Sequence, residues 1–158
     1  MTVMEAIEAR RSIRKYQPVP IEPEKLSRVL EAGRLAPSAR NAQIWQFVLV
    51  RDAGLRQKLV AACCDQGMVG EAPAVLVVCA TQTSTMACGQ ERSSIDCAIA
   101  LSFMMLEAAE QGLGTCWLGA FHADQVSRVL GLPQHYIPVA VSPLGYPAEE
   151  PAPRPRKE

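Results

Sequence analysis

The hydrophobic pattern of residues 94–111 gives the strongest structural prediction in the chain. The stretch reads SIDCAIALSFMMLEAAEQ, has no Pro or Gly, and between Ile95 and Leu106 only Asp96 and Ser102 interrupt its apolar residues. A helix that is hydrophobic on every side must be covered on every side, and this one is too short to cross a bilayer, which takes about 20 apolar residues. A sheet covers only one side. We therefore expect a homodimer in which the second copy covers the other; the alternative is a central helix covered by its own chain.

Four further stretches show the spacing of amphipathic helices, with apolar residues three and four positions apart. Pro23 suits the first turn of the second helix and Pro37 stops it, and Gly131 suits the end of the fourth. The expected helices cover residues 3–9, 23–35, 53–64 and 123–130.

Four apolar runs predict strands, at residues 45–50, 74–80, 115–118 and 136–142. The run AVLVVCA at 74–80 is continuously apolar, as in a central strand, whereas Pro138 predicts an edge position or a bulge. Polar loops at 36–43 and 81–93 separate these elements, and five prolines from Pro143 onward predict an extended tail over 143–158. We expect a single domain over 1–158, an α+β fold of the α/β sandwich type with helices on both faces of one sheet.

Composition narrows the range of functions. The 16 basic and 16 acidic residues cancel, which argues against the basic field of a nucleic-acid-binding protein. No export signal precedes the first helix, so a cytoplasmic location with reduced thiols is expected. The six cysteines include the adjacent pair Cys63 and Cys64, whose redox role stays open, but no C-x-x-C pair. Zinc-ligand spacing is therefore missing, and no metal site is expected.

Positive charge is concentrated in two short segments, 10–15 and 154–157. Arginine side chains bind phosphate oxygens in pairs, and in an extended backbone Arg10, Ser12 and Arg14 share one side. Alone, the first segment is equally typical of a solvated turn after a helix, and the second is more typical of a disordered terminus. Two arginine clusters in a chain without net charge suggest instead that both close on one phosphate.

Two further segments, 37–43 and 112–121, are rich in small or amide residues that admit a flat ligand close to the backbone. Each also suits an ordinary connection or strand end. None of the four segments contains a His, Asp or Glu, although His122 adjoins one. A site without a base indicates that a bound cofactor supplies the chemistry.

Together, the motifs ARRSIRKY, APSARNAQIWQF, GLGTCWLGAF after the apolar helix, and PLGYP before RPRK resemble the FMN-dependent nitroreductase family in order and spacing, over nearly the whole chain. The resemblance implies a mixed, mostly antiparallel sheet flanked by helices, in an intertwined homodimer with FMN at the interface. It also implies ping-pong hydride transfer from NADH or NADPH to FMN and then to a small-molecule acceptor such as a nitroaromatic, quinone or enone.

The resemblance assigns cofactor-binding residues and no catalytic side chain. The phosphate, ribityl and ring contacts are Arg10, Arg11, Ser12 and Arg14, and the C-terminal basic pair on the phosphate side is Arg154 and Arg156. The loop that reaches the flavin from the partner subunit contains Pro37, Ser38, Ala39, Asn41 and Gln43. The segment under the ring is Leu118, Gly119 and Ala120, with a backbone N–H directed at flavin N5.

Two departures from the family pattern qualify the expected activity. Ile44 stands where the family usually has Pro, and residues 81–93 are short where many members carry a helical excursion over the flavin. A reduced lid predicts an open acceptor site. It also keeps two alternatives in view, namely a module that stores or delivers flavin without turnover of its own, and an enzyme of this fold with a different reaction.

Overall fold

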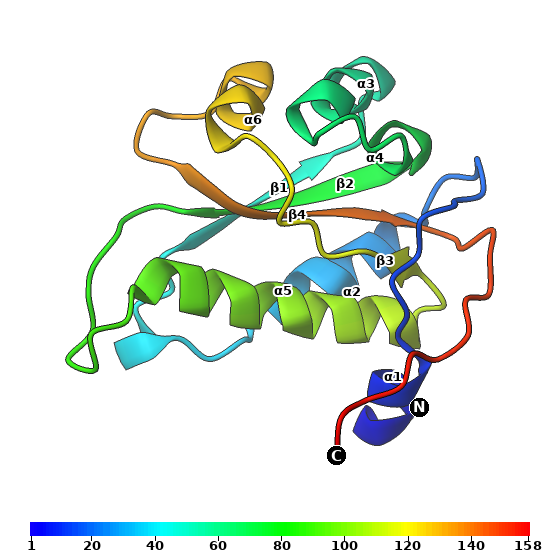
Figure 1. Cartoon of the computed structure of the whole chain (residues 1–158), viewed down its shortest axis with the longest axis horizontal. Helices are drawn as coiled ribbons and strands as arrows, with labels where there is room; N and C mark the ends of the chain where they lie inside the picture. Colours follow the sequence, from blue (N-terminus) through cyan, green and yellow to red (C-terminus); the bar gives the residue numbers. More distant parts are fainter.

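A four-stranded sheet lies between two layers of helices in the computed structural model, which describes residues 1–158 (Figure 1). The strand order is β1-β2-β4-β3, with every neighbouring pair antiparallel and one isolated parallel bridge between Ser12 and Thr115. The predicted fold class is confirmed. The strands are β1 (Trp45–Val50), β2 (Ala74–Ala80), β3 (Gly114–Thr115) and β4 (Ile137–Gly145).

The helices divide between the two faces of the sheet. In Figure 1, α3 and α6, with the short α4, cover one face, and α2 and α5 cover the other. The terminal helix α1 lies at the end of α5, close to both chain termini. The bounds are α1 (Val3–Ala9), α2 (Pro23–Arg34), α3 (Ala53–Ala62), α4 (Met68–Glu71), α5 (Arg92–Glu110) and α6 (Ala123–Leu130).

Strand β2 explains why its sequence is continuously apolar. All seven of its residues are buried, because side chains alternate across a strand and both faces of this one are covered. Val75, Val77 and Cys79 join the core under α3, α4 and α6, whereas Leu76 and Val78 join the core against α2 and α5.

Strand β4 decides between two sequence predictions for Pro138 and differs from the prediction for Pro143. Pro138 pairs with Cys79 where the β2–β4 register shifts, so in this inner strand it marks the bulge rather than an edge. The strand then continues past the expected start of the tail, because Pro143 pairs with Val75 and Leu144 is fully buried. The extended tail therefore begins after Gly145.

Smaller differences lie at helix and strand ends. Helix α5 begins at Arg92, two residues before the expected start, because the carboxylate of Glu91 accepts the first free backbone N–H groups. Helix α4 was not predicted. The expected strand at 115–118 is the two-residue β3 followed by an isolated bridge between Leu118 and Val141.

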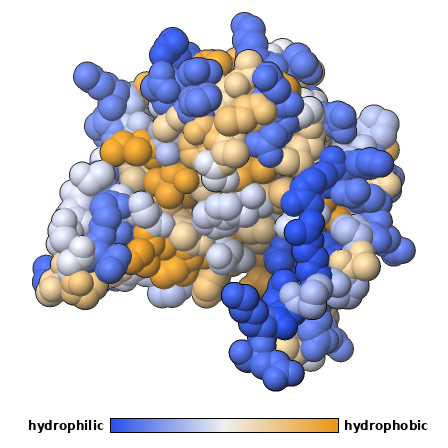
Figure 2. All heavy atoms as spheres, viewed as in Figure 1, coloured by the Kyte–Doolittle hydropathy of each residue, from blue (hydrophilic) through white to orange (hydrophobic).

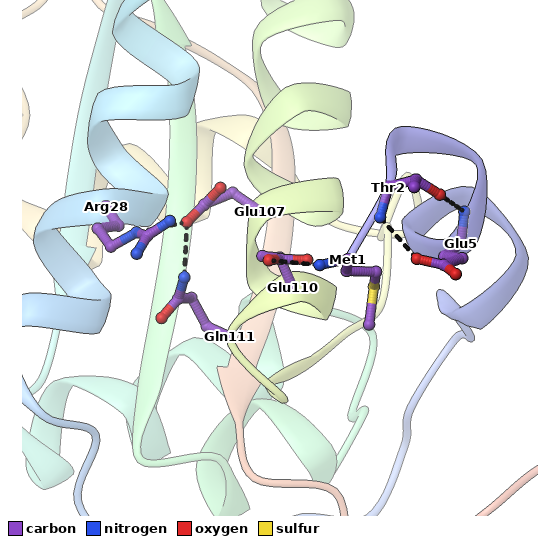
Figure 3. Close-up of polar contacts among 7 residues, drawn as sticks. All are labelled: Met1, Thr2, Glu5, Arg28, Glu107, Glu110 and Gln111. Atoms are coloured by element: carbon purple, nitrogen blue, oxygen red, sulfur yellow. Dashed lines mark hydrogen bonds and ion pairs between the residues drawn. The ribbon is translucent and has the colours of Figure 1, made fainter.

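Polar contacts fix the C-terminal end of α5 against its neighbours (Figure 3). The N-terminal ammonium of Met1 lies 3.2 Å from Oε1 of Glu110, and Nε of Arg28 on α2 donates to Oε1 of Glu107 at 2.9 Å. Thr2 and Glu5 form a reciprocal capping box that begins α1. Of these contacts, the pair between Met1 and Glu110 joins the start of α1 to α5, and so helps to place the arginine-rich segment that follows α1.

One apolar face of α5 stays uncovered within a single chain. Ile95 is 36% exposed and Phe103 is 42% exposed, and Ile99, between them on the same face, is half-buried. Figure 2 shows hydrophobic side chains at the surface over α5, next to a hydrophilic column formed by the N-terminal segment and the tail. No helix in the structure combines the length and hydrophobicity needed to cross a membrane.

Candidate functional site

The two arginine clusters, 140 residues apart in sequence, line one cavity of about 560 Å³. Only two of its eleven lining residues are hydrophobic. The structure thus brings both predicted basic segments to one place. The predicted site residues at this cavity are Arg10, Arg11, Ser12, Arg14, Arg154 and Arg156.

Backbone pairing sets the direction of the N-terminal segment. The N–H of Ile13 donates to the carbonyl of Thr115 at 2.9 Å, and Ser12 forms its parallel bridge with the same residue. Ile13 is buried at 5% exposure, and the hydroxyl of Tyr16 donates to its carbonyl at 2.8 Å. Side chains alternate along extended backbone, so burial of Ile13 leaves the residues on either side of it directed at the cavity.

The arginines of the cavity are free of carboxylate partners. No ion pair within 4.0 Å involves Arg10, Arg14, Arg154 or Arg156. Two of the guanidinium groups donate to nearby backbone carbonyls instead: that of Arg11 to Glu8 and Arg10 at the end of α1, which helps to hold the turn, and that of Arg14 to Ser12 at 3.4 Å. Unpaired guanidinium groups that converge on one cavity suit a phosphate dianion.

Two buried groups beside the cavity titrate outside their ordinary ranges. Burial raises the pKa of the Tyr16 hydroxyl and also that of the Cys116 thiol, where the nearby Arg14 and Arg10 partly oppose the shift. Both groups are therefore neutral at pH 7. The backbone N–H of Arg14 donates to Oε1 of Glu149 at 2.6 Å, which ties the tail to the N-terminal segment.

The segment 118–120 presents two free backbone donors. The N–H of Leu118 is used in the sheet, since it donates to the carbonyl of Val141 at 2.8 Å. The N–H groups of Gly119 and Ala120 donate to no group of the chain, and both residues are exposed. Nε2 of Gln66 donates to the carbonyl of Ala120 at 3.0 Å and thereby orients this turn. Within this segment, the N–H groups of Gly119 and Ala120 are therefore the ones available to a ligand.

The loop Pro37–Gln43 lies at the other end of α5 (Figure 1). The N–H of Ala39 donates to Asp96 near the start of the helix, whereas the arginine segment shares a second cavity with Ala109 near its end. The 13 residues from Asp96 to Ala109 span roughly 20 Å at about 1.5 Å per residue. Within one chain the loop and the arginine cavity therefore do not meet.

The loop contains an unusual concentration of left-handed backbone. Arg40, Asn41 and Gln43 have φ angles of 56°, 52° and 49°, a region that non-glycine residues rarely occupy and that is often found at binding sites. The N–H of Gln43 donates to Oγ of Ser38 at 3.0 Å, and its side-chain amide donates to the carbonyl of Asn41 at 3.1 Å. The predicted loop residues are Pro37, Ser38, Ala39, Asn41 and Gln43.

Sequence reasoning missed three residues that shape these segments, Gln66, Asp96 and Glu149. Gln66 lies in a stretch with no distinguishing pattern, and nothing in the proline-rich tail sets Glu149 apart. Asp96 left a signal, because an acidic residue within an apolar helix needs a reason.

The comparisons with known proteins agree with this geometry. The Nitroreductase family model matches residues 7–67 and 61–146. A protein of Methanothermobacter thermautotrophicus, provisionally named NADH dehydrogenase/NAD(P)H nitroreductase, is 36% identical over 158 residues, which cover 98% of this chain and 82% of the relative.

Solved structures show the same fold. A nitroreductase family protein from Clostridium novyi NT superposes with a TM-score of 0.89 at 30% identity, over 94% of this chain and 87% of the other. An FMN-dependent nitroreductase from Clostridium difficile R20291 gives a TM-score of 0.83 at 29% identity, over 94% and 89% of the two chains. On the family match and the sequence identity together, the chain belongs to the nitroreductase family.

Proposed function

We propose that the protein is an NAD(P)H-dependent flavin oxidoreductase that binds FMN and passes electrons to a small-molecule acceptor of the nitroaromatic, quinone or enone type. The observation that carries the proposal is the meeting of two arginine clusters at one cavity. Family membership supports it, as do the names of the M. thermautotrophicus relative, which includes NAD(P)H, and of the C. difficile neighbour, which includes FMN.

The residues present fit this cofactor. Arg10, Arg14, Arg154 and Arg156 would hold its phosphate, because they converge without carboxylate partners. The free N–H groups of segment 118–120 would donate to the ring edge, where fixed backbone dipoles stabilise negative charge. When bound, FMN supplies hydride chemistry that no side chain of these segments provides.

The site is completed by a second copy of the chain. The loop Pro37–Gln43 lies at the far end of α5 from its own arginine cavity, so the loop of one copy would serve the cavity of the other. The uncovered apolar face of α5 supplies the surface on which the copies would pair. A homodimer therefore belongs to the same proposal, as does a cytoplasmic location.

The test of cofactor binding is titration of the apoprotein with FMN and with riboflavin, followed by the quenching of flavin fluorescence. We expect FMN to bind much more tightly than riboflavin in the wild type, because only FMN carries the phosphate. Arg14→Ala should weaken FMN binding and leave riboflavin binding unchanged; Lys58→Ala on α3, outside the site, is the control. A wild-type protein that binds neither ligand would refute the proposal.

Turnover separates the enzyme from a flavin-storage module. The FMN-loaded protein should lose its flavin absorbance when NADH or NADPH is added without oxygen, and recover it when menadione or a nitrofuran follows. Multiple turnovers per flavin support the oxidoreductase. Binding of FMN without reduction by either nicotinamide would instead favour the storage or delivery module.

A further inference from the structure

Asp96 is a buried carboxylate that the fold of α5 does not need. It is 1% exposed and lies in the first half of the helix among residues of the apolar core. The helix N-terminus already has a carboxylate cap in Glu91, which accepts from the backbone N–H groups of Ser93 and Ser94. A buried charge opposes folding unless its partners compensate for the lost solvation, so another role must account for it.

The partners of Asp96 are few and point to one segment. Its Oδ1 accepts from the N–H of Ala39 at 3.1 Å, 57 residues away in sequence, and its Oδ2 has no partner. Nε of Arg92, one turn earlier, is also buried without a partner, yet the two side chains form no ion pair. The one hydrogen bond of the Asp96 carboxylate is therefore made with the loop Pro37–Gln43.

This contact is the only hydrogen bond that joins residues 37–43 to another element. The other hydrogen bonds of the segment, those of Asn41, Ala42 and Gln43, stay within the loop. Ala39 immediately precedes the left-handed residues Arg40 and Asn41. Such backbone persists only where the surroundings determine it, and here the one hydrogen bond from outside the loop is that of Asp96.

We propose that Asp96 is a positioning residue for cofactor binding, whose buried carboxylate fixes the strained loop in the conformation that receives the ring of the flavin bound by the second copy. The inference rests on the proposed function. It predicts that the carboxylate serves binding rather than stability: replacing an incompletely paired buried carboxylate with an apolar group is often neutral or stabilising, whereas loss of the loop geometry weakens binding.

The experiment compares wild type with Asp96→Ala and Asp96→Asn, using FMN and riboflavin titration, thermal unfolding of the apoprotein and trypsin cleavage after Arg40. We expect Asp96→Ala to weaken both ligands by the same factor, on the order of tenfold or more, as for loss of a hydrogen bond to a charged group. Its apoprotein should unfold at an equal or higher temperature, and cleavage after Arg40 should be faster. Asp96→Asn retains an acceptor for the Ala39 N–H and should stay near wild type.

Controls separate the possible failures. Lys58→Ala, on α3 across the sheet and exposed, should change nothing. Should Asp96→Ala not fold, Asp96→Leu fills the site and carries the same expectations. Unchanged affinity and cleavage in the alanine or leucine variant overturn the positioning role while FMN binding by the wild type stands. A parallel loss of affinity and unfolding temperature overturns it as well, because that pattern marks a structural role; no flavin binding by the wild type overturns both proposals.

Discussion

Ile99→Glu tests whether the uncovered face of α5 joins two copies of the chain. Ile99 lies four residues from both Ile95 and Phe103, so all three share one face of the helix. A glutamate there interrupts the apolar stripe at its centre. If two copies pair through this face around a two-fold axis, each also brings a carboxylate into the pairing surface.

The magnitude follows from the exposed fractions of the two flanking residues. Phe103 is 42% exposed, which for an aromatic side chain of roughly 200 Å² leaves about 85 Å² to be covered, worth about 2 kcal/mol at ~25 cal/mol per Å². Ile95, 36% exposed, adds roughly 0.5–1 kcal/mol. Both copies contribute, so the stripe is worth about 5 kcal/mol, a factor of roughly 10³ to 10⁴ in the dimerisation constant.

Sedimentation velocity over a concentration series measures the effect. Wild type should sediment as a dimer at micromolar concentration, whereas Ile99→Glu should sediment as a folded monomer with weak FMN binding. Gln57→Glu, which adds the same charge on exposed α3 across the sheet, is the matched control. If the Ile99→Glu protein remains a flavin-loaded dimer, the interface lies elsewhere and the reasoning from α5 is wrong.

Three further predictions concern the cavity and the start of α5. Arg10→Ala and Arg14→Ala should each weaken FMN binding by about 1.5–3 kcal/mol, as measured by fluorescence titration; unchanged binding in both would mean that the phosphate lies elsewhere. Gly114→Ala should lower stability by about 1–3 kcal/mol and weaken FMN binding, because its methyl group would lie 2.7 Å from Cγ1 of the buried Ile13; urea denaturation and titration that both match wild type would contradict this. Hydrogen bonds from serine hydroxyls lower the pKa of Glu91 from 4.5 to about 2, so its stabilisation is complete above pH 4.5 and is lost as the pH falls toward 2. Thermal unfolding of wild type and Glu91→Gln should therefore differ at pH 7 and converge near pH 2; a difference independent of pH would contradict the assignment.

Elements with strong local patterns could be predicted from the sequence to the residue. Strands β1 and β2 have the expected bounds because their apolar runs end at polar or turn residues on both sides. Helix α6 ends as expected because Gly131 adopts the left-handed conformation that a helix end requires. The arginine cavity could be predicted for a different reason. Positive charge is concentrated in two segments of a chain without net charge, and this indicated that the two segments meet.

Features that depend on long-range contacts could not be predicted from the sequence. The hydrogen bond between Asp96 and Ala39 joins residues 57 positions apart, and no local periodicity encodes it. The number of prolines after Pro143 suggested a tail, but tertiary burial of Leu144 holds that stretch in the sheet. The central helix keeps one apolar face uncovered within one chain, with Phe103 exposed, and its cover by a second copy stays a prediction.

The placement of the loop and the arginine cavity at opposite ends of α5 has a thermodynamic consequence. If each pocket takes one wall from each subunit, pigment uptake and pairing are linked equilibria, and free FMN favours the paired state by mass action. Dilution would then release FMN from the protein as well as dissociate the two copies. Co-expression of an Arg14→Ala chain with a chain damaged in the loop would give a mixed dimer with one intact pocket. Both defects would lie in its second pocket, because each pocket combines the arginine segment of one copy with the loop of the other.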